Sequence, residues 1–213
     1  GSEAGGDRNG VGAWSVFAHT GGDVGDASSW RAGLSYLRAR PRDRASEIEM
    51  DEEHLETWFS GTSKTWLADF VWKWAPEGNA RTRNFKFQAE YFRRAESGDM
   101  RCAGGACTDG ASPYRSRQSG WYAQAIHQFM PRWRLGLRYD RLDDGTVDFG
   151  GLPIDAERHD PSRWSLMADY SPSEYARIRL QLARDRAMAG NPDDSQVTLQ
   201  YIHTLGAHGA HKF

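Results

Sequence analysis

The residues best suited to bind a metal ion are three histidines near the end of the sequence, His203, His208 and His211. Imidazole nitrogens bind zinc and copper, and His208 and His211 lie close enough in a glycine-rich stretch to reach one ion if the backbone bends. Regular strand geometry instead places His208 on the opposite face from the other two. No carboxylate or thiolate completes the site, so the alternative is a polar strand end. The polar strand end is the favoured interpretation, so we expect no cofactor, and zinc at these histidines is the alternative.

Charged side chains that alternate with apolar ones form a second candidate site. Ten of them are predicted to line a pore, namely Arg31, Lys73, Lys86, Glu90, Arg134, Arg138, Asp140, Asp169, Arg177 and Arg179. Guanidinium groups bind oxyanions through two hydrogen bonds, so the four arginines between residues 134 and 179 are expected to attract anions. Salt bridges among the same basic and acidic groups are the alternative, and they would narrow or close the pore.

The two cysteines, Cys102 and Cys107, are separated by four residues, of which two are glycines. This segment bends easily enough to join the thiols, and a disulfide in a polar loop fits an oxidising compartment. Half of a metal site is the rival interpretation, but it would need a second cysteine pair or a nearby histidine pair, which the sequence lacks. We therefore expect a disulfide in an external loop.

Catalytic side chains do not stand in a spacing that requires catalysis. His159 is followed by Asp160 and Ser162 in a predicted loop, and His127 stands within a predicted strand. A hydrolase would need a histidine held against a serine or aspartate partner. Seven histidines among many Asp and Ser produce such neighbours by chance, so the chain is not expected to be an enzyme.

The composition limits the class of protein that positions these residues. Apolar residues make up 38% of the 213 residues, charged residues 26%, and the mean hydropathy is -0.75. No apolar run reaches the about 18 residues of a transmembrane helix. The 9 Trp, 8 Tyr and 9 Phe are too many aromatics for a disordered chain. The net charge of -2 gives no reason to expect nucleic acid as a partner.

A period of two in the hydropathy pattern predicts β-strands. In residues 133–140 one set of alternate side chains is Trp, Leu, Leu and Tyr, while the other is Arg, Gly, Arg and Asp. Residues 84–91 and 176–182 repeat the pattern, so each strand has one apolar and one charged face. About nine strands are expected, over residues 11–21, 28–40, 62–75, 82–95, 118–130, 132–143, 161–171, 175–187 and 195–213. The predicted fold is all-β, antiparallel and up-and-down.

The connections between these strands alternate between short and long. Residues 41–61, 96–117 and 143–160 form the long ones, whereas 131–132 and 172–174 are tight turns. Outer-membrane barrels have this asymmetry, and a soluble β-sandwich gives no reason for it. The acidic segment 41–61 is predicted to be a solvated loop, and its alternative role is to bind divalent cations that bridge lipopolysaccharide.

The apolar faces are expected to meet lipid. Tryptophans stand near the ends of the predicted strands, as an interfacial girdle requires, and the strands reach the about 9–11 residues that cross a bilayer at a tilt. The charged faces would then line a wet interior. A soluble sandwich or lipocalin-like barrel with the apolar face inside is the alternative. The prediction is thus a transmembrane β-barrel.

The sequence resembles Gram-negative outer-membrane β-barrel proteins. The resemblance covers most of the chain and is carried by residues 118–124, residues 131–140 and the tail 205–213, which ends on Phe213. These segments are similar to a porin-like family described as zinc-regulated outer-membrane proteins, loosely similar to phosphate-selective porins. The resemblance implies a bacterial outer-membrane location, contact with lipid and lipopolysaccharide, and a link to zinc. It also implies passage of small solutes and assembly by the barrel machinery, with Phe213 as the signal. His211 departs from the pattern, because many barrels carry a hydrophobe there.

The strand count predicts that residues 1–213 form one domain, the C-terminal part of a larger even-stranded barrel. Nine strands with a periplasmic C-terminus put the N-terminus outside, whereas bacterial barrels have an even strand number and both termini periplasmic. Residues 1–10 cannot supply a spanning strand, and no plug domain is expected within the chain. The expected function is a passive channel for small solutes. A structural or adhesion barrel with a closed lumen is the alternative.

Overall fold

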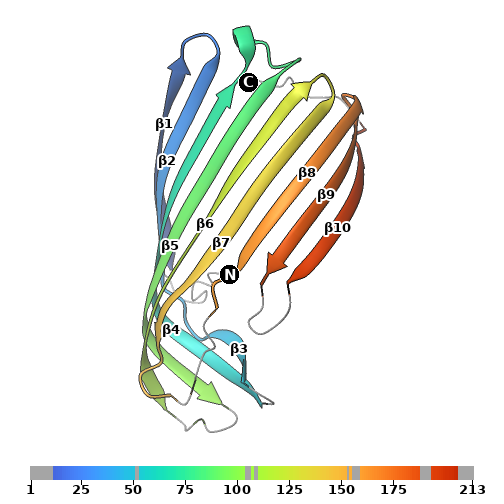
Figure 1. The fold of residues 1–213 in the computed structure, drawn as a ribbon. Helices are drawn as coiled ribbons and strands as arrows, with labels where there is room; N and C mark the ends of the chain where they lie inside the picture. The colour runs from blue at the N-terminus through green and yellow to red at the C-terminus, as the bar shows by residue number, and fades with distance from the viewer. Residues whose placement is uncertain are drawn as a thin grey trace.

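The computed structural model describes residues 12–50, 53–103, 107, 110–152, 154, 159–187 and 193–205. Within them the chain folds into one curved antiparallel sheet of ten strands (Figure 1). The strands are β1 (Ala13–Val24), β2 (Ser28–Ala39), β3 (Arg44–Met50), β4 (Glu53–Trp74), β5 (Asn84–Ala103), β6 (Ala111–Met130), β7 (Trp133–Asp148), β8 (Ser162–Ser173), β9 (Ala176–Arg186) and β10 (Asp194–His203), with a 3-10 turn η1 (Pro76–Gly78) after β4. The predicted all-β, up-and-down fold is confirmed.

The sheet is a meander in which strands that follow each other along the chain pair with each other. Its order is β1-β2-β4-β5-β6-β7-β8-β9-β10, and β3 pairs only with β4. The short connections after β1, β4, β6 and β8 lie at one end of the sheet, here called the turn end (Figure 1). β3 and the extended parts of β4, β5 and β6 lie at the other end, called the hairpin end (Figure 1).

Two of the predicted long loops are paired strands instead. Residues 41–61 contain β3 and the first part of β4, which makes the strand count ten rather than nine, and residues 96–117 contain the ends of β5 and β6. The β4–β5 pairing runs without interruption from Trp74 opposite Phe85 to Glu56 opposite Ala103. The prediction was wrong because these segments have the polar composition of loops, whereas ladder hydrogen bonds join backbone groups whatever side chains are present.

A small hydrophobic core holds the hairpin end together. Leu55 and Phe59 of β4, Met100 of β5 and Tyr114 of β6 are buried with Ile154, which follows β7. The Phe59 and Tyr114 rings lie 5.2 Å apart between centroids, in an edge-to-face arrangement. Such a pair contributes beyond the apolar area that it buries. The core therefore fixes the extended strands against each other.

The predicted disulfide between Cys102 and Cys107 is present, with the two Cα atoms 5.7 Å apart. Cys102 is a residue of β5 and a buried member of the hydrophobic core, not part of an external loop. The expectation of a loop holds for Cys107, which lies in the connection after β5, and is wrong for Cys102, because β5 continues to Ala103. The bridge therefore ties the end of a strand to the segment that follows it.

Two glycines allow β4 and β5 to approach closely at the start of the hairpin end. Gly61 and Gly98 stand directly opposite each other in the ladder. A Cβ added to Gly98 would collide with the Ser60 carbonyl and with the Gly61 backbone. A glycine within a strand commonly marks such a close backbone approach.

The sheet is open within the described residues. β1 pairs with β2 and β10 with β9, and no ladder joins β1 to β10, so the expected barrel is not closed by these strands. The last strand ends at His203 rather than at residue 213. Phe213, the predicted assembly signal, lies outside the described residues.

In the part of the chain that the structure describes, no helix is both long and apolar enough to cross a membrane.

We predict that Gly98→Val destabilises the hairpin end by about 2–4 kcal/mol, because its side chain must displace the backbone of β4. Gly110→Val is the matched control, since an added Cβ there meets nothing within 4 Å. Urea unfolding followed by tyrosine and tryptophan fluorescence measures both variants. Equal stabilities for the two would contradict the close approach.

Candidate functional site

The pairing register brings the ten predicted pore-lining residues to one face of the sheet, called the charged face. Side chains directly opposite each other in a ladder point to the same side, and so do alternate residues of one strand. Lys73 lies opposite Lys86, and Asp169 lies opposite both Arg134 and Arg179. The remaining members, Arg31, Glu90, Arg138, Asp140 and Arg177, have the same parity on their strands.

Asp169 forms a buried ion pair in the middle of the charged face. Its side chain is 1% exposed and accepts hydrogen bonds from Nε and Nη2 of Arg179 at 2.7 and 2.8 Å. Arg177 lies 4.0 Å from the same carboxylate. Arg134 instead donates to the Gln128 amide oxygen at 3.1 Å. One carboxylate therefore serves two arginines, and the local charge stays positive.

A second ion pair lies further along the same face. Arg138 donates three hydrogen bonds of 2.6 to 2.9 Å to the two Asp140 oxygens. The Arg138 guanidinium also stands 3.8 Å from the centre of the Tyr122 ring, a cation–π distance. These contacts hold the guanidinium in one orientation.

Asp69 of β4 gathers two basic side chains of the neighbouring strands. His19 Nε2 lies 3.1 Å and Arg31 Nη2 lies 3.8 Å from its carboxylate. The sequence pattern did not identify His19 as a residue of the charged face. It lies two residues before Gly21 and four before Asp23, on the same face of β1. A period of two counted back from Asp23 would have identified it.

The charged face is hollowed between β6 and β9. A groove of about 470 Å³ is lined by residues that include Arg138, Asp140, Arg163, Arg179 and Gln181. Arg163, which the sequence analysis did not select, pairs with Asp185 at 3.1 Å. The groove thus combines guanidinium groups with polar amide and hydroxyl groups, which is the chemistry that binds oxyanions.

Basic side chains outnumber acidic ones among the predicted pore-lining residues of this face. The ten predicted residues together with Asp69 contain seven basic and four acidic side chains. The ion pairs use the carboxylates of Asp69, Asp140 and Asp169, so basic groups remain in excess. A surface with an excess of one charge raises the local concentration of the opposite ion.

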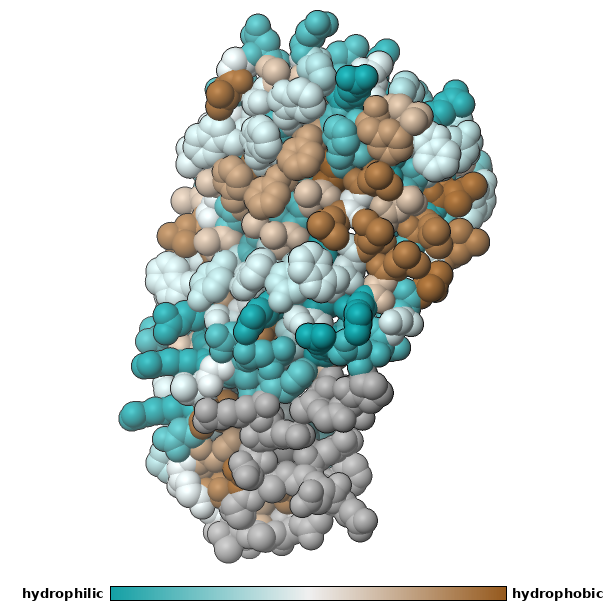
Figure 2. Space-filling view, in the orientation of Figure 1, coloured by the Kyte–Doolittle hydropathy of each residue, from teal (hydrophilic) through white to brown (hydrophobic). Residues whose placement is uncertain are grey.

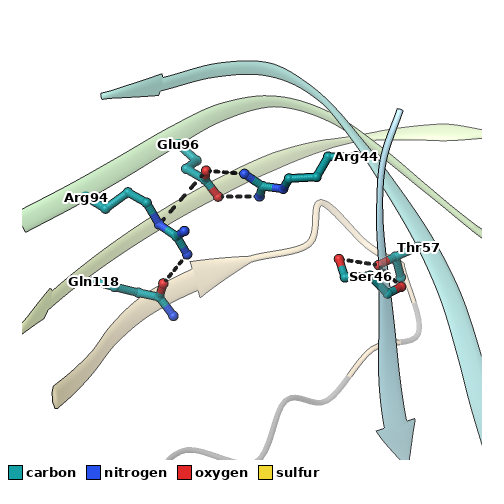
Figure 3. Close-up of polar contacts among 6 residues, drawn as sticks. All are labelled: Arg44, Ser46, Thr57, Arg94, Glu96 and Gln118. Atoms are coloured by element: carbon teal, nitrogen blue, oxygen red, sulfur yellow. Dashed lines mark hydrogen bonds and ion pairs between the residues drawn. The ribbon is translucent and has the colours of Figure 1, made fainter. Parts of the chain in front are cut away.

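Glu96 joins three strands where the charged face meets the hairpin end (Figure 3). Its carboxylate, 1% exposed, accepts hydrogen bonds from Nη1 and Nη2 of Arg44 on β3 at 2.8 and 2.9 Å. Arg94 lies 4.0 Å away and donates to the Gln118 side chain of β6 at 2.7 Å. This polar cluster fixes β3, which has no other strand partner than β4 in the described residues.

The electrostatics of Glu96 make this cluster sensitive to pH. Burial alone would raise the pKa of the carboxyl, but the hydrogen bonds from Arg44 and the positive charges of Arg94 and Arg44 outweigh it and hold the pKa below its ordinary value of 4.5. A carboxyl with a lowered pKa in the folded state stabilises the fold fully above its ordinary pKa. That contribution is lost as the pH falls below 4.5 through the lowered value.

The histidines considered for metal binding or catalysis form no site within the described residues. His203 is exposed on β10 opposite Ala176, while His208 and His211 lie outside the described residues. Among the residues described, no three metal-binding side chains gather. His159 contacts the Arg186 carbonyl at 2.8 Å, and His127 contacts the Asn84 carbonyl at 3.2 Å.

The opposite face of the sheet, called the apolar face, carries exposed hydrophobic side chains. Between its two ends lie aliphatic residues that are 43% to 75% exposed, namely Leu34, Leu135, Leu137, Leu166, Leu180, Leu182, Val197 and Leu199. Figure 2 looks onto this face and shows a brown band between paler, aromatic rows. An apolar patch of this extent on a protein surface marks a contact with another molecule or with lipid.

Aromatic rings border the band on both sides. The row nearer the hairpin end, called the hairpin-end aromatic row, consists of Trp14, Tyr36, Trp66, Tyr91, Trp121, Tyr139 and Trp164. Ring centroids are 4.6 Å apart for Tyr36 and Trp66 and 4.4 Å apart for Tyr139 and Trp164. At the turn end, Trp72 and Phe85 are 5.6 Å apart. The rings therefore form nearly continuous lines across the strands.

The hairpin-end aromatic row is staggered along the sheet in a constant direction. Tyr36 lies opposite Trp66 and Tyr91 opposite Trp121, but the row shifts by two residues between Trp66 and Tyr91. On average the row therefore shifts by one residue from each strand to the next. This is a shift of about 3.4 Å along the strands for each step of about 4.8 Å across the sheet. Strands tilted by about 35° would bring these rings into one plane, and that is the tilt of closed barrels.

We predict that Glu96→Gln lowers the free energy of unfolding at pH 7 by about 2–4 kcal/mol, because it removes the charge of the buried carboxylate that accepts two hydrogen bonds from Arg44. The variant should also show a smaller decrease in stability below pH 4.5 than the native chain, because it lacks the titrating Glu96 carboxyl. Urea unfolding at pH 7 and pH 4 measures both effects.

Asp43→Asn provides the control, because its 2.7 Å pair with Arg101 is exposed at both ends. Its effect should stay within about 1 kcal/mol. If both variants lower the free energy of unfolding equally, the inference that the buried Glu96 pair stabilises the fold more than an exposed ion pair is wrong.

Comparisons with known proteins give no function for this arrangement. No protein-family model matches the chain. No solved structure matches it either. Among curated proteins, the chain is similar to an uncharacterised protein of Aquifex aeolicus (strain VF5), at 31% identity over 202 residues. The match covers 92% of this chain, and the chain spans about 40% of the length of the relative.

Proposed function

We propose that these strands form part of the wall of an outer-membrane channel, with the apolar face against lipid and the charged face along a water-filled passage for small anions. The observation that carries the proposal is the exposed apolar band between two aromatic rows, opposite a face of paired charges. A lipid-facing barrel surface has this order of apolar band and flanking aromatic girdles.

The strand dimensions support a bilayer crossing. β8, β9 and β10 contain 12, 11 and 10 residues, close to the about 9–11 residues of a tilted membrane strand. The stagger of the hairpin-end aromatic row fits the same tilt. A soluble protein would leave these leucines in water, at a cost of about 25 cal/mol for each Å² of apolar surface.

A channel also requires strands besides the ten described. β1 and β10 are edges, and an open sheet edge does not occur in the hydrocarbon core because its N–H and C=O groups have no partners there. We therefore propose that these strands belong to a larger, even-stranded barrel. The relative of Aquifex aeolicus is long enough to contain further strands, because the chain spans 40% of it.

The passage would select for anions through its basic excess. Arg177 is 35% exposed and lies near a carboxylate that Arg179 already occupies, and Arg134 contacts a neutral amide. These two guanidinium groups carry charge that acidic side chains do not cancel. Their field reaches about 8 Å at physiological ionic strength, so selectivity should strengthen in dilute salt.

A closed structural barrel is the second candidate. The ion pairs of Arg179, Arg138 and Arg163 lie across the charged face and would occupy part of a lumen. The hydrophobic core at the hairpin end fills space on the same side of β4, β5 and β6. Conductance separates the two candidates, because the closed barrel passes no current.

We predict that Leu180→Arg reduces insertion of the complete barrel into phosphatidylcholine vesicles, at a cost of about 2–4 kcal/mol near the middle of the bilayer. Gln181→Arg is the matched control, because the next residue along β9 faces the groove of the charged face. Protection of the chain from protease after mixing with vesicles measures insertion. Equal losses for both variants would contradict a lipid-facing apolar surface.

We predict that the complete barrel, with the further strands proposed above, conducts and prefers anions in a planar bilayer, and that Arg134→Ala with Arg177→Ala lowers its anion-to-cation permeability ratio roughly two- to fivefold. The reversal potential across a tenfold potassium chloride gradient measures the ratio. Arg81→Ala with Arg83→Ala, exposed in the turn after β4, removes the same charge and should leave it unchanged. Absence of current would favour the structural barrel, and cation preference would remove the arginine mechanism.

A further inference from the structure

A row of basic side chains follows the hairpin-end aromatic row on the apolar face. It is called the basic belt and consists of Arg38, Lys64, Arg93, Arg141 and Arg184. Each lies two residues beyond an apolar or aromatic side chain of the same strand, toward the hairpin end, as Arg38 does beyond Tyr36 and Lys64 beyond Trp66. Figure 2 shows the corresponding hydrophilic band below the lower aromatic row. The belt therefore runs beside the hairpin-end aromatic row, on its hairpin-end side, on strands between β2 and β9.

Two members of the belt already have anionic partners. Arg141 lies 3.1 Å from Asp160, and Arg184 lies 2.7 Å from Asp193. Both acids come from connections at the hairpin end. These two basic groups are therefore satisfied by the protein itself.

Arg38, Lys64 and Arg93 have no ion pair within the described part of the chain, although they occupy three adjacent strands. Arg38 lies directly opposite Lys64, where two like charges repel. The other positions in register with the three carry Trp14, Ala95, Trp66 and Ser119, none of them acidic. Arg38 Nε is also buried and without a hydrogen-bond partner in this part of the chain. The three basic groups are therefore available to bind an external anion.

The side chains beside these three basic groups indicate what carries that anion. Trp66 and Tyr36 lie next to them, followed by Leu34 and Phe70 further into the apolar band. A ligand that meets both surfaces has a negatively charged head and an apolar tail. Phosphate suits the head, because arginine binds its oxygens through two hydrogen bonds and lysine adds a point charge.

We propose that Arg38, Lys64 and Arg93 bind the phosphate group of a membrane lipid, whose acyl chains lie along the apolar band of β2, β4 and β5. This inference rests on the proposed membrane location of the apolar face. Opposite residues of adjacent strands lie about 5 Å apart and diagonal ones about 7–8 Å apart, so one phosphorylated headgroup can reach all three side chains. Basic groups at a membrane surface attract anionic lipid in this way.

The test measures which lipid the complete barrel, which contains these ten strands, selects in vesicles. Quenching of tryptophan fluorescence by lipids with brominated acyl chains gives the relative binding constants of phosphatidic acid and phosphatidylcholine. We expect phosphatidic acid to bind roughly five- to tenfold more tightly. Arg38→Gln with Lys64→Gln and Arg93→Gln should abolish this preference while the far-ultraviolet circular dichroism stays unchanged.

A matched control removes the same charge at the turn end. Arg81→Gln with Arg83→Gln and Arg132→Asn replaces basic groups of the turns after β4 and β6, and asparagine tolerates the positive φ of 73° at residue 132. This variant should keep the preference for phosphatidic acid. If it loses the preference as the first variant does, net charge rather than the basic belt selects the lipid, and the inference is wrong.

A separate arm distinguishes lipid from free phosphate. Inorganic phosphate at 10 mM should leave the preference unchanged, because it lacks acyl chains to contact the band. If it removes the preference, the three residues bind a free anion, and the lipid assignment is wrong. Equal quenching by both lipids in the native barrel would also overturn the inference. Absence of quenching by either lipid would instead contradict the proposed membrane location.

Discussion

The inter-strand register is the constraint on which the rest of this structure depends. Successive side chains of a strand point to opposite faces, so a slip of one residue in any ladder would move its charged groups among the apolar ones. The observed register keeps the two kinds of side chain apart. It places Asp169 between Arg134 and Arg179 on the charged face and Leu137 beside Leu166 on the apolar face. Both the buried ion pairs and the apolar band follow from this register.

The two faces impose different chemistry on the same strands. On the charged face, carboxylates such as Asp169 are almost fully buried because bidentate guanidinium partners replace their water. On the apolar face, leucines remain exposed and aromatic rings mark the boundaries of the band. The stagger of those rings follows from the pairing register. The same register therefore sets both the strand tilt at which the rings lie in one plane and the position of each ring along its strand.

The hairpin end is stabilised by contacts that the rest of the sheet does not use. Phe59, Tyr114 and the disulfide of Cys102 form a conventional core there, and Glu96 connects β3 to β5 through Arg44. The close approach at Gly61 and Gly98 lies between this end and the band. The extended strands therefore form a structured cap beside the charged face.

The sequence by itself determined the fold class, the approximate positions of nine strands and the two-faced character of each, because a period of two depends only on local order. It also identified the disulfide from the short spacing of Cys102 and Cys107. Only the tertiary structure decided that the acidic segment pairs as β3, that His19 joins Asp69 and that Arg44 neutralises Glu96, 52 residues away in sequence. These contacts depend on which strands become neighbours and in which register. Long-range backbone hydrogen bonds set both, and a local hydropathy pattern does not record them.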